Sequence, residues 1–248
     1  MVIHPYPGFD GGRADEGAVR DERPQRRLMA RVSRALVLRH TTRRPVAGLD
    51  GIVLHLADDV LPLWRAVQLA TRDGDAPLPY WAFAWGGGLA IACYLREHPA
   101  VVAGRRVLDL GSGSGLCAIV AAEAGATTVT AVDIDPIAIR AIELNARANG
   151  RRLDIVQRDL LGTPPPRDVD VILAGDCWYD ASLAERVTPW LRRADAVGID
   201  VLIGDPGRRF LPLADLAQLA EYDVRTTTEL EDLDRRSAGV YRFRSAPA

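Results

Sequence analysis

Beyond Gly104 the chain alternates between short β-branched runs and helical stretches, and this alternation restricts the fold more than composition does. Two helical stretches, LCAIVAAEAGA and PIAIRAIELNARANG, separate the first three of five runs with strand character. These runs are RRVLDL, TVTAVDI, LDIVQRD, VDVILAGD and VLIGD. Strands and helices alternating at this spacing predict an α/β fold with a parallel, doubly wound sheet and helices on both faces.

The segments that flank this region predict additions to it. Near the C-terminus, VRTTTELE and GVYRFR lie close enough in sequence to pair as antiparallel strands. Upstream, GIVLHLADDVLPLWRAVQ predicts a short strand and then a helix that begins at Asp58 or Asp59. An apolar helix follows and ends before Pro99, which cannot continue it.

Residues 27–44 are rich in arginine and lack acids, with Leu28, Val32 and Leu36 at helical spacing. We interpret them as an amphipathic helix with a solvated basic face; an acidic partner surface is the alternative. The predicted organisation is a mobile tail, an N-terminal helical extension that contributes to the cofactor and substrate site, and an α/β core. Their respective bounds are residues 1–26, 27–100 and 101–248.

Composition excludes several classes of protein. The formal net charge of -2 provides no global field to attract nucleic acid or anionic lipid. Three cysteines without a CxxC pair argue against disulfides and structural zinc, so we predict no metal site. No run reaches the ~18 apolar residues of a membrane span, and we expect a cytoplasmic protein. Every Lys+Arg residue is arginine, so the chain cannot methylate a lysine of its own.

The first strand leads into a run of alternating glycines, VLDLGSGSG. Ligands of doubly wound sheets bind beyond the carboxyl ends of the strands, and glycine lets the backbone pass close under them. Position 116, where a dinucleotide-binding GxGxxG would end, is leucine. The run from Asp109 through Gly115 instead suits a nucleoside without pyrophosphate, namely S-adenosylmethionine.

Two further acids follow in the expected order. Asp133 ends the second strand, where a carboxylate can accept hydrogen bonds from both ribose hydroxyls. Asp159 ends the third strand, where an acceptor could receive the adenine amino group. Asp135, rather than Asp133, is the expected cap of the helix that opens at Pro136.

These motifs together resemble the class I S-adenosylmethionine-dependent methyltransferases. PYWAFAWGGGLAIACYL, LAGDCWYD, RVTPWL and IGDPGRRFLP narrow the resemblance to bacterial relatives of the electron-transfer flavoprotein beta-subunit lysine methyltransferase. That family belongs to the seven-strand protein-lysine methyltransferases with a D/E-x-x-Y/F motif after strand four. The resemblance implies a Rossmann-like, seven-stranded, mostly parallel sheet with an antiparallel C-terminal strand.

The resemblance also implies where the cofactor binds. Trp85 should lie against it, Gly111 and Gly113 should line its methionine end, and Asp133 should bind ribose. Asp159 and Leu160 should border the adenine, with Gly175 nearby. The remaining members of the predicted cofactor set are Asp109, Ser112, Gly115 and Ile134. The expected product is S-adenosylhomocysteine.

The motif Asp176-Cys177-Trp178-Tyr179 is the predicted catalytic segment. Asp176 could hold a substrate amine, and Trp178 and Tyr179 could wall a narrow channel whose rings attract ammonium. The alternative is that Asp176 only caps the following turn. Further along, Asp205, Arg208 and Phe210 are candidate substrate contacts on the same rim of the sheet.

Two functions from different substrate classes follow. The first is a protein-lysine N-methyltransferase acting on a flavoprotein beta subunit. The second is a small-molecule N- or C-methyltransferase for an indole- or pyridine-like heterocycle, favoured by the extra aromatic residue in DCWY, the arginines near the C-terminus and the N-terminal tail. Nucleic-acid methylation is disfavoured, because Cys177 and Trp178 replace the prolines that shape base-amine sites.

Overall fold

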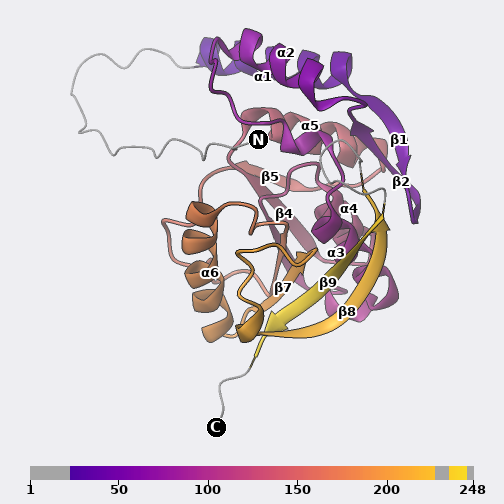
Figure 1. The fold of residues 1–248 in the computed structure, drawn as a ribbon. Coiled ribbons are helices and arrows are strands. Elements are labelled where there is room, and N and C mark those ends of the chain that lie inside the picture. The colour runs from indigo at the N-terminus through magenta and orange to yellow at the C-terminus, as the bar shows by residue number, and fades with distance from the viewer. Residues whose placement is uncertain (1–22, 227–234, 245–248) are drawn as a thin grey trace, which may run out of the picture.

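The computed structural model describes residues 23–226 and 235–244, with a seven-stranded sheet at its centre (Figure 1). In sheet order the strands are β5 (Asp154–Gln157), β4 (Thr128–Asp133), β3 (Arg106–Leu110), β6 (Val171–Gly175), β7 (Asp200–Asp205), β9 (Arg235–Phe243) and β8 (Leu216–Arg225). The first five are parallel, and β9 is antiparallel to both of its neighbours. The predicted Rossmann-like fold class is therefore confirmed.

Helices cover both faces of this sheet. Because successive strand residues point to opposite faces, each strand contributes side chains to two cores. Val107 of β3 belongs to the core under α3 (Gly86–Glu97), α4 (Leu116–Glu123) and α5 (Pro136–Ala148). Leu108, the next residue, belongs to the core under α6 (Ala181–Ala196). The strand order reverses between β3 and β6, which makes the carboxyl ends of these two strands the topological switch point.

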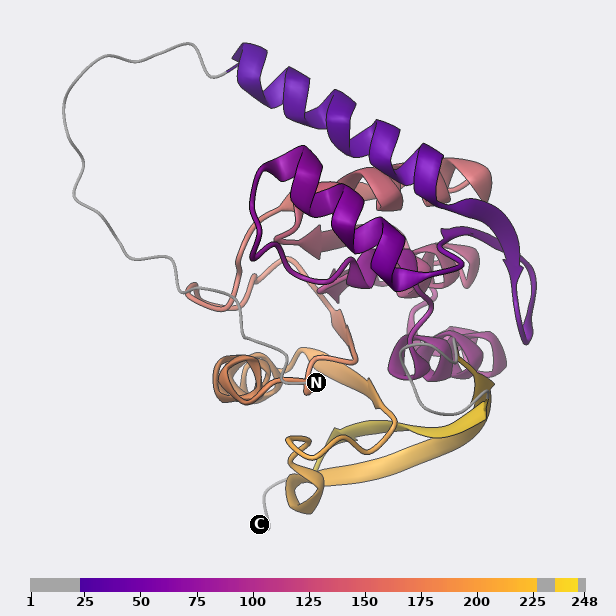
Figure 2. The ribbon, with the colours of Figure 1, turned by 45° about the horizontal axis from the view of Figure 1, so that its top comes forward.

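An N-terminal layer packs on the outer side of α5 (Figure 2). It contains α1 (Arg23–His40), α2 (Val60–Thr71) and an antiparallel hairpin of β1 (Thr42–Val46) and β2 (Leu49–Leu56). Short 3₁₀ turns lie at Tyr80–Ala82, Pro99–Val101 and Leu213–Asp215. Asp59 caps α2 by accepting a hydrogen bond from the Leu61 amide, which confirms one of the two predicted starts.

Two predictions need correction. The basic segment is helical only to His40, since Thr42–Val46 is the first strand of the hairpin, so the extension is not purely helical. The strand before the C-terminal one is Leu216–Arg225; the run VRTTTELE contributes only its first two residues to it, and 227–234 lie outside the described residues. Alternation of apolar residues is weak in LAQLAEYDVR, which is why the sequence placed this strand too late.

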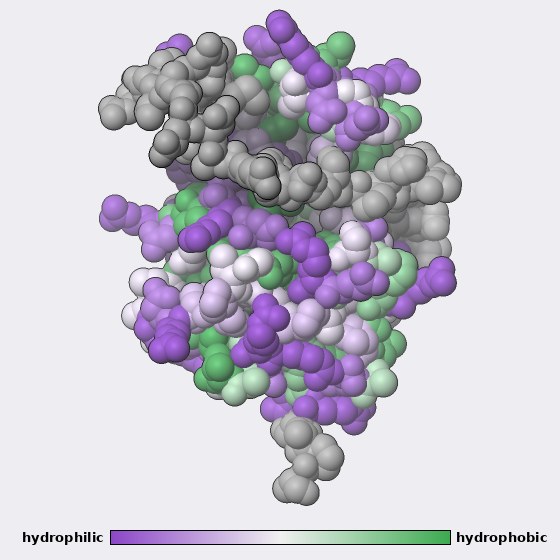
Figure 3. Space-filling model, turned by 90° about the vertical axis from the view of Figure 1, so that its left-hand side faces the viewer, coloured by the Kyte–Doolittle hydropathy of each residue, from purple (hydrophilic) through white to green (hydrophobic). Residues whose placement is uncertain are grey.

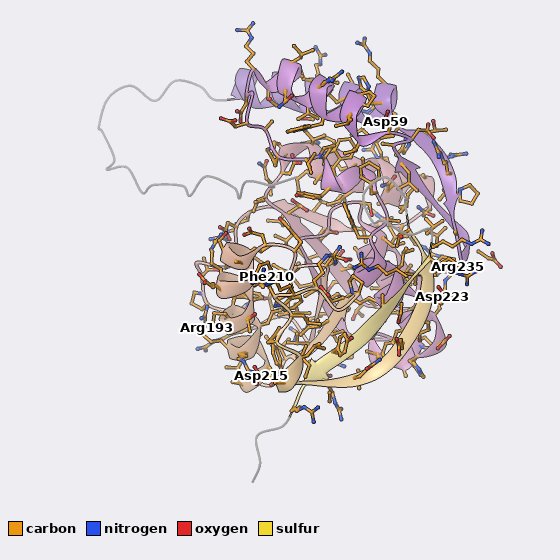
Figure 4. The ribbon with its side chains drawn as sticks, viewed as in Figure 1. Asp59, Arg193, Phe210, Asp215, Asp223 and Arg235 are labelled. Atoms are coloured by element: carbon orange, nitrogen blue, oxygen red, sulfur yellow. The ribbon has the colours of Figure 1, made fainter. Side chains whose placement is uncertain are left out.

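Pairing of β8 with β9 is supported by an ion pair between Asp223 and Arg235, whose charged groups are 2.6 Å apart (Figure 4).

The predicted tail lies outside the described residues up to position 22, and α1 begins at Arg23. On the α6 side, hydrophilic residues dominate and hydrophobic ones form separate small patches (Figure 3). None of the helices in the described part of the chain is long and apolar enough to cross a bilayer.

Candidate active site

The glycine run forms the turn from β3 into α4. Gly111, Gly113 and Gly115 have φ angles of 66°, 54° and 82°, a region in which L side chains are strained. Asp109 is buried beneath the turn, where its Oδ2 accepts hydrogen bonds from Ser112 Oγ at 2.5 Å and the Ala118 amide at 3.1 Å. Burial raises the pKa of the Asp109 carboxyl to about 6. Through its two hydrogen bonds, the Asp109 carboxyl holds the glycine turn against the first turn of α4.

Asp133, at the carboxyl end of β4, faces the same turn. Its Oδ2 accepts a hydrogen bond from the Gly113 amide at 2.8 Å, and its Oδ1 accepts one from the Asp135 amide at 2.9 Å. Burial raises the pKa of the Asp133 carboxyl. A carboxylate has about four lone-pair directions, so these two bonds leave acceptor capacity for a ribose hydroxyl. Asp135 caps α5 through the Ile137 amide at 2.7 Å, as predicted.

A pocket opens at the switch point, between the glycine turn and the start of α3. Several residues of the predicted cofactor set line it, together with five, Ser114 among them, that sequence reasoning had not assigned to the cofactor. The predicted ones are Trp85, Asp109, Gly111, Ser112, Gly113 and Gly175, and the catalytic candidate Asp176 joins them. The others include Phe83, Gly88, Leu116 and Cys117. The turn after β3, the end of β6 and the start of α3 thus contribute to one pocket.

Four aromatic rings form a row that starts in the pocket: Phe83 and Trp85 line the pocket, and Tyr80 and Tyr179 continue the row beyond it. Ring centroids are 6.1 Å apart for Phe83 and Trp85, 5.7 Å for Tyr80 and Trp85, and 5.1 Å for Tyr80 and Tyr179. Burial raises the pKa of the Tyr179 phenol, which therefore stays protonated at neutral pH. Tyr179 can donate a hydrogen bond but is not a base.

Asp176 lies just beyond β6 with a left-handed backbone conformation, φ 57°. Its Oδ2 accepts a hydrogen bond from the Gly88 amide at 2.8 Å, and its Oδ1 pairs with Arg208. Gly88 belongs to the first turn of α3, whose amides have no partner within the helix. Asp176 therefore caps α3, an element far upstream, while Asp180 is the cap of the following helix α6.

Backbone packing places α3 this close to the sheet. A Cβ atom added to Gly87 or to Gly204 would lie closer than 3.0 Å to the other residue's backbone, and one added to Gly175 would lie 3.1 Å from Gly88. The triple glycine after Trp85 thus lets the N-terminus of α3 contact the carboxyl ends of β6 and β7 directly.

Other predicted residues lie elsewhere. Trp178 is fully buried against α6, with its Nε1 donating to Thr188 Oγ1 at 2.9 Å, so packing replaces its expected role as a channel wall. Asp159 is exposed and pairs with Arg186 of α6 at 2.5 Å. Leu160 packs at the edge of the α6 core. Asp133, Gly115 and Ile134 are not among the pocket-lining residues, although Ile134 is 45% exposed beside Asp133.

The substrate candidates separate into two places. Asp205 ends β7 and is fully buried, with its Oδ1 accepting the Arg208 amide at 2.6 Å. Arg208 reaches back to Asp176. Phe210 lies beside α6, 38% exposed (Figure 4). Thus Asp205 and Arg208 join the catalytic candidate, whereas Phe210 stands apart on the surface.

The donor set fits S-adenosylmethionine. Three glycines at positive φ leave space that Cβ atoms would fill, and Asp133 lies beside Gly113 with acceptor capacity left for a diol. Trp85 and Phe83 offer apolar ring faces next to these groups. No group of three or more metal-ligating side chains was found among residues 23–226 and 235–244.

Known proteins that are similar to this chain are methyltransferases. Residues 93–175 match the family model of ribosomal protein L11 methyltransferase (PrmA). A solved Pyrococcus horikoshii protein, assigned provisionally as an RNA methyltransferase, shares the fold at a TM-score of 0.50 and 18% identity, over 68% of this chain and 89% of its own. Fold and site together define a class I S-adenosylmethionine-dependent methyltransferase.

Sequence relatives identify the family. The electron transfer flavoprotein beta subunit lysine methyltransferase of Xenopus laevis is 38% identical over 228 residues, which cover 89% of this chain and 90% of that protein. The rat protein of the same name is 42% identical, over 66% of this chain and 67% of its own length. The chain belongs to the electron transfer flavoprotein beta subunit lysine methyltransferase family.

Replacing Asp133 by alanine is expected to weaken cofactor binding by about 10- to 100-fold, because the predicted ribose acceptor and the support of Gly113 are lost together. Titration calorimetry with S-adenosylhomocysteine measures the change. The matched control is Asp135→Ala, which removes the α5 cap and about 1 kcal/mol of stability but no ribose acceptor. Equal affinities of Asp133→Ala and the parent would refute the ribose assignment.

Proposed function

We propose that this protein transfers the methyl group of S-adenosylmethionine to lysine ε-amino groups of an electron transfer flavoprotein beta subunit. The observation that carries the proposal is Asp176, a carboxylate held at the pocket beside the aromatic row. A carboxylate next to ring faces recognises an alkylammonium group. The family membership and the names of the relatives support the protein acceptor.

The cofactor supplies a sulfonium methyl group that is already activated for displacement. The chain must therefore bind the acceptor in line with that methyl group and exclude water. Asp176 attracts the lysine side chain as ammonium, and the proton leaves to solvent before the nitrogen attacks. A nitrogen–carbon bond forms, the sulfur–carbon bond breaks, and S-adenosylhomocysteine is released. Trp85 and Tyr179 wall the path along which the side chain enters.

The phenol and the two thiols near the pocket do not act as bases. Burial raises the pKa of the Tyr179 phenol and of the Cys117 and Cys177 thiols, so all three are protonated at neutral pH. We infer that removal of the amine from water, which disfavours its charged form, promotes deprotonation more than a dedicated side chain does.

The small-molecule alternative loses one of its supports, because Trp178, the extra aromatic residue of DCWY, faces the α6 core instead of the pocket. The arginines near the C-terminus include Arg235, which pairs with Asp223 across the strands. The N-terminal tail lies outside the described residues up to position 22.

The test is transfer of a labelled methyl group to a purified flavoprotein beta subunit, followed by mass spectrometry of the acceptor. Because the enzyme contains no lysine, every methyllysine recovered comes from the acceptor. We expect label on lysine, and roughly 100-fold slower labelling with the Asp176→Asn enzyme. A lysate divided into protein and small-molecule fractions provides the contrary outcome: label confined to small molecules would refute the protein acceptor.

A further inference from the structure

Three charged side chains meet where β6 and β7 end: Asp176, Asp205 and Arg208. One guanidinium nitrogen of Arg208, Nη1, pairs with Oδ1 of Asp176 and lies 3.7 Å from Oδ2 of Asp205. The side chains of Arg208, Asp176 and Asp205 are only 15%, 11% and 0% exposed. One cation is therefore held between two carboxylates in a site largely screened from water.

The guanidinium group occupies the place where an acceptor's cation would have to bind. Both oxygens of Asp176 already have donors, the Gly88 amide on Oδ2 and Arg208 on Oδ1. The Cζ atom of Arg208 also lies 5.9 Å from the ring centroid of Trp85, within cation–π range. Arg208 thus makes the same two kinds of contact that the proposed function assigns to the lysine ammonium.

Asp205 offers an alternative position for the guanidinium. Its Oδ1 accepts the Arg208 amide, but its Oδ2 is buried without a hydrogen-bond partner. Burial raises the pKa of this carboxyl to about 6, so it is ionised at neutral pH and above. A buried acceptor without a donor is rare in folded proteins. It lies within one small movement of the guanidinium, because the two groups are 3.7 Å apart.

We propose that Arg208 is an internal occupant of the acceptor-cation site, which the incoming ammonium displaces from Asp176 toward Asp205. The identity of that ammonium as lysine rests on the proposed function; the cation site itself does not. Arg208 is then a positioning and specificity-determining residue. A neutral metabolite cannot compete for Asp176, so only a cationic acceptor opens the site.

The test uses Arg208→Ala enzyme saturated with S-adenosylhomocysteine and titrated with guanidinium chloride at millimolar concentration. Without its own guanidinium the site is open, and we expect calorimetry to show binding at least about tenfold tighter than to the parent. Urea, which has a similar planar shape but no charge, should bind neither protein. Arg209→Ala is the matched control, since Arg209 is exposed and lies over the Phe210 ring instead.

Kinetics with the flavoprotein subunit provide the second measurement. Arg208→Ala should lower the KM for the acceptor by up to about tenfold, because the site no longer needs to be vacated, while kcat does not rise. Free guanidinium should inhibit this variant competitively and leave the parent unaffected. Arg208→Lys, which keeps a cation in the site, should restore resistance to guanidinium. If Arg208→Ala unfolds, Arg208→Gln, which keeps the side-chain length without charge, replaces it in both measurements.

Two results would overturn the proposal. If parent and variant bind guanidinium equally, Arg208 does not occupy a cation site. If the variant raises the acceptor KM, Arg208 holds the acceptor instead of competing with it. The calorimetry needs no protein acceptor, so tight guanidinium binding together with absence of lysine methylation would refute only the proposed function.

Discussion

The Gly87→Ala variant should melt about 6 to 12 °C below the parent, or fail to accumulate as folded protein. A methyl group at Gly87 would lie closer than 3.0 Å to the carbonyl of Gly204, which is backbone of a central strand and cannot rotate aside. Overpacking of this kind costs roughly 3 kcal/mol or more, and each kcal/mol lowers Tm by about 2 to 4 °C in a protein of this size. Thermal melting followed by circular dichroism measures it.

Gly74→Ala is the matched control, because nothing lies within 4 Å of the added methyl group. We expect it to change stability by no more than about 0.5 kcal/mol. Gly88→Ala is a second comparison on α3 itself, where the new Cβ would meet Cys117 Sγ at an ordinary 3.7 Å. If Gly87→Ala melted together with either control, the direct seating of α3 on β7 would be wrong.

The Asp176→Asn variant should keep its fold and its affinity for cofactor while kcat/KM falls roughly 100-fold. Asparagine tolerates the left-handed backbone at φ 57°, and its carbonyl oxygen can still accept the Gly88 amide. What it loses is the charge that attracts an ammonium group, and removing one partner of a buried charge pair costs about 2 to 5 kcal/mol. Steady-state kinetics with the flavoprotein subunit measure kcat/KM, and calorimetry with S-adenosylhomocysteine measures the affinity for cofactor.

Asp176→Ala separates the two roles of this carboxylate. It loses the charge, the cap of α3 and a residue type that accepts positive φ, so it should be less stable than Asp176→Asn by about 1 to 3 kcal/mol. A difference in stability with a shared loss of turnover is the expected pattern. Turnover of Asp176→Asn at the parental rate would remove Asp176 from the acceptor site.

The sequence predicted the parts of this structure that depend on local order along the chain. Alternating strands and helices, the glycine turn and the caps Asp59 and Asp135 are set by residues within a few positions of one another. The positions of Asp109 and Asp133 at strand ends follow from the same pattern.

Hydrogen bonds between residues far apart in the sequence could not be predicted from that local pattern. Asp176 caps a helix 88 positions upstream, and nothing near it in sequence indicates this. Asn145 is another case: its side chain donates to the Ser114 carbonyl at 2.8 Å and accepts from the His55 amide at 2.7 Å, joining the glycine turn to β2. Trp178 faces inward because the turn before α6 directs it there, which its place in the motif does not reveal.

The direct contact between the backbones of α3 and β7 restricts which substitutions this enzyme can accept during evolution. Gly87 and Gly204 hold α3 against β7 beside the pocket, so a substitution at either is expected to remove folded protein before it can create a new specificity. Phe210 and Tyr179, at 38% exposure each, have no such second duty at the same junction. Selection for a different acceptor, in the laboratory or in evolution, would therefore change exposed residues such as Phe210 and Tyr179 and leave the contact between α3 and β7 unchanged.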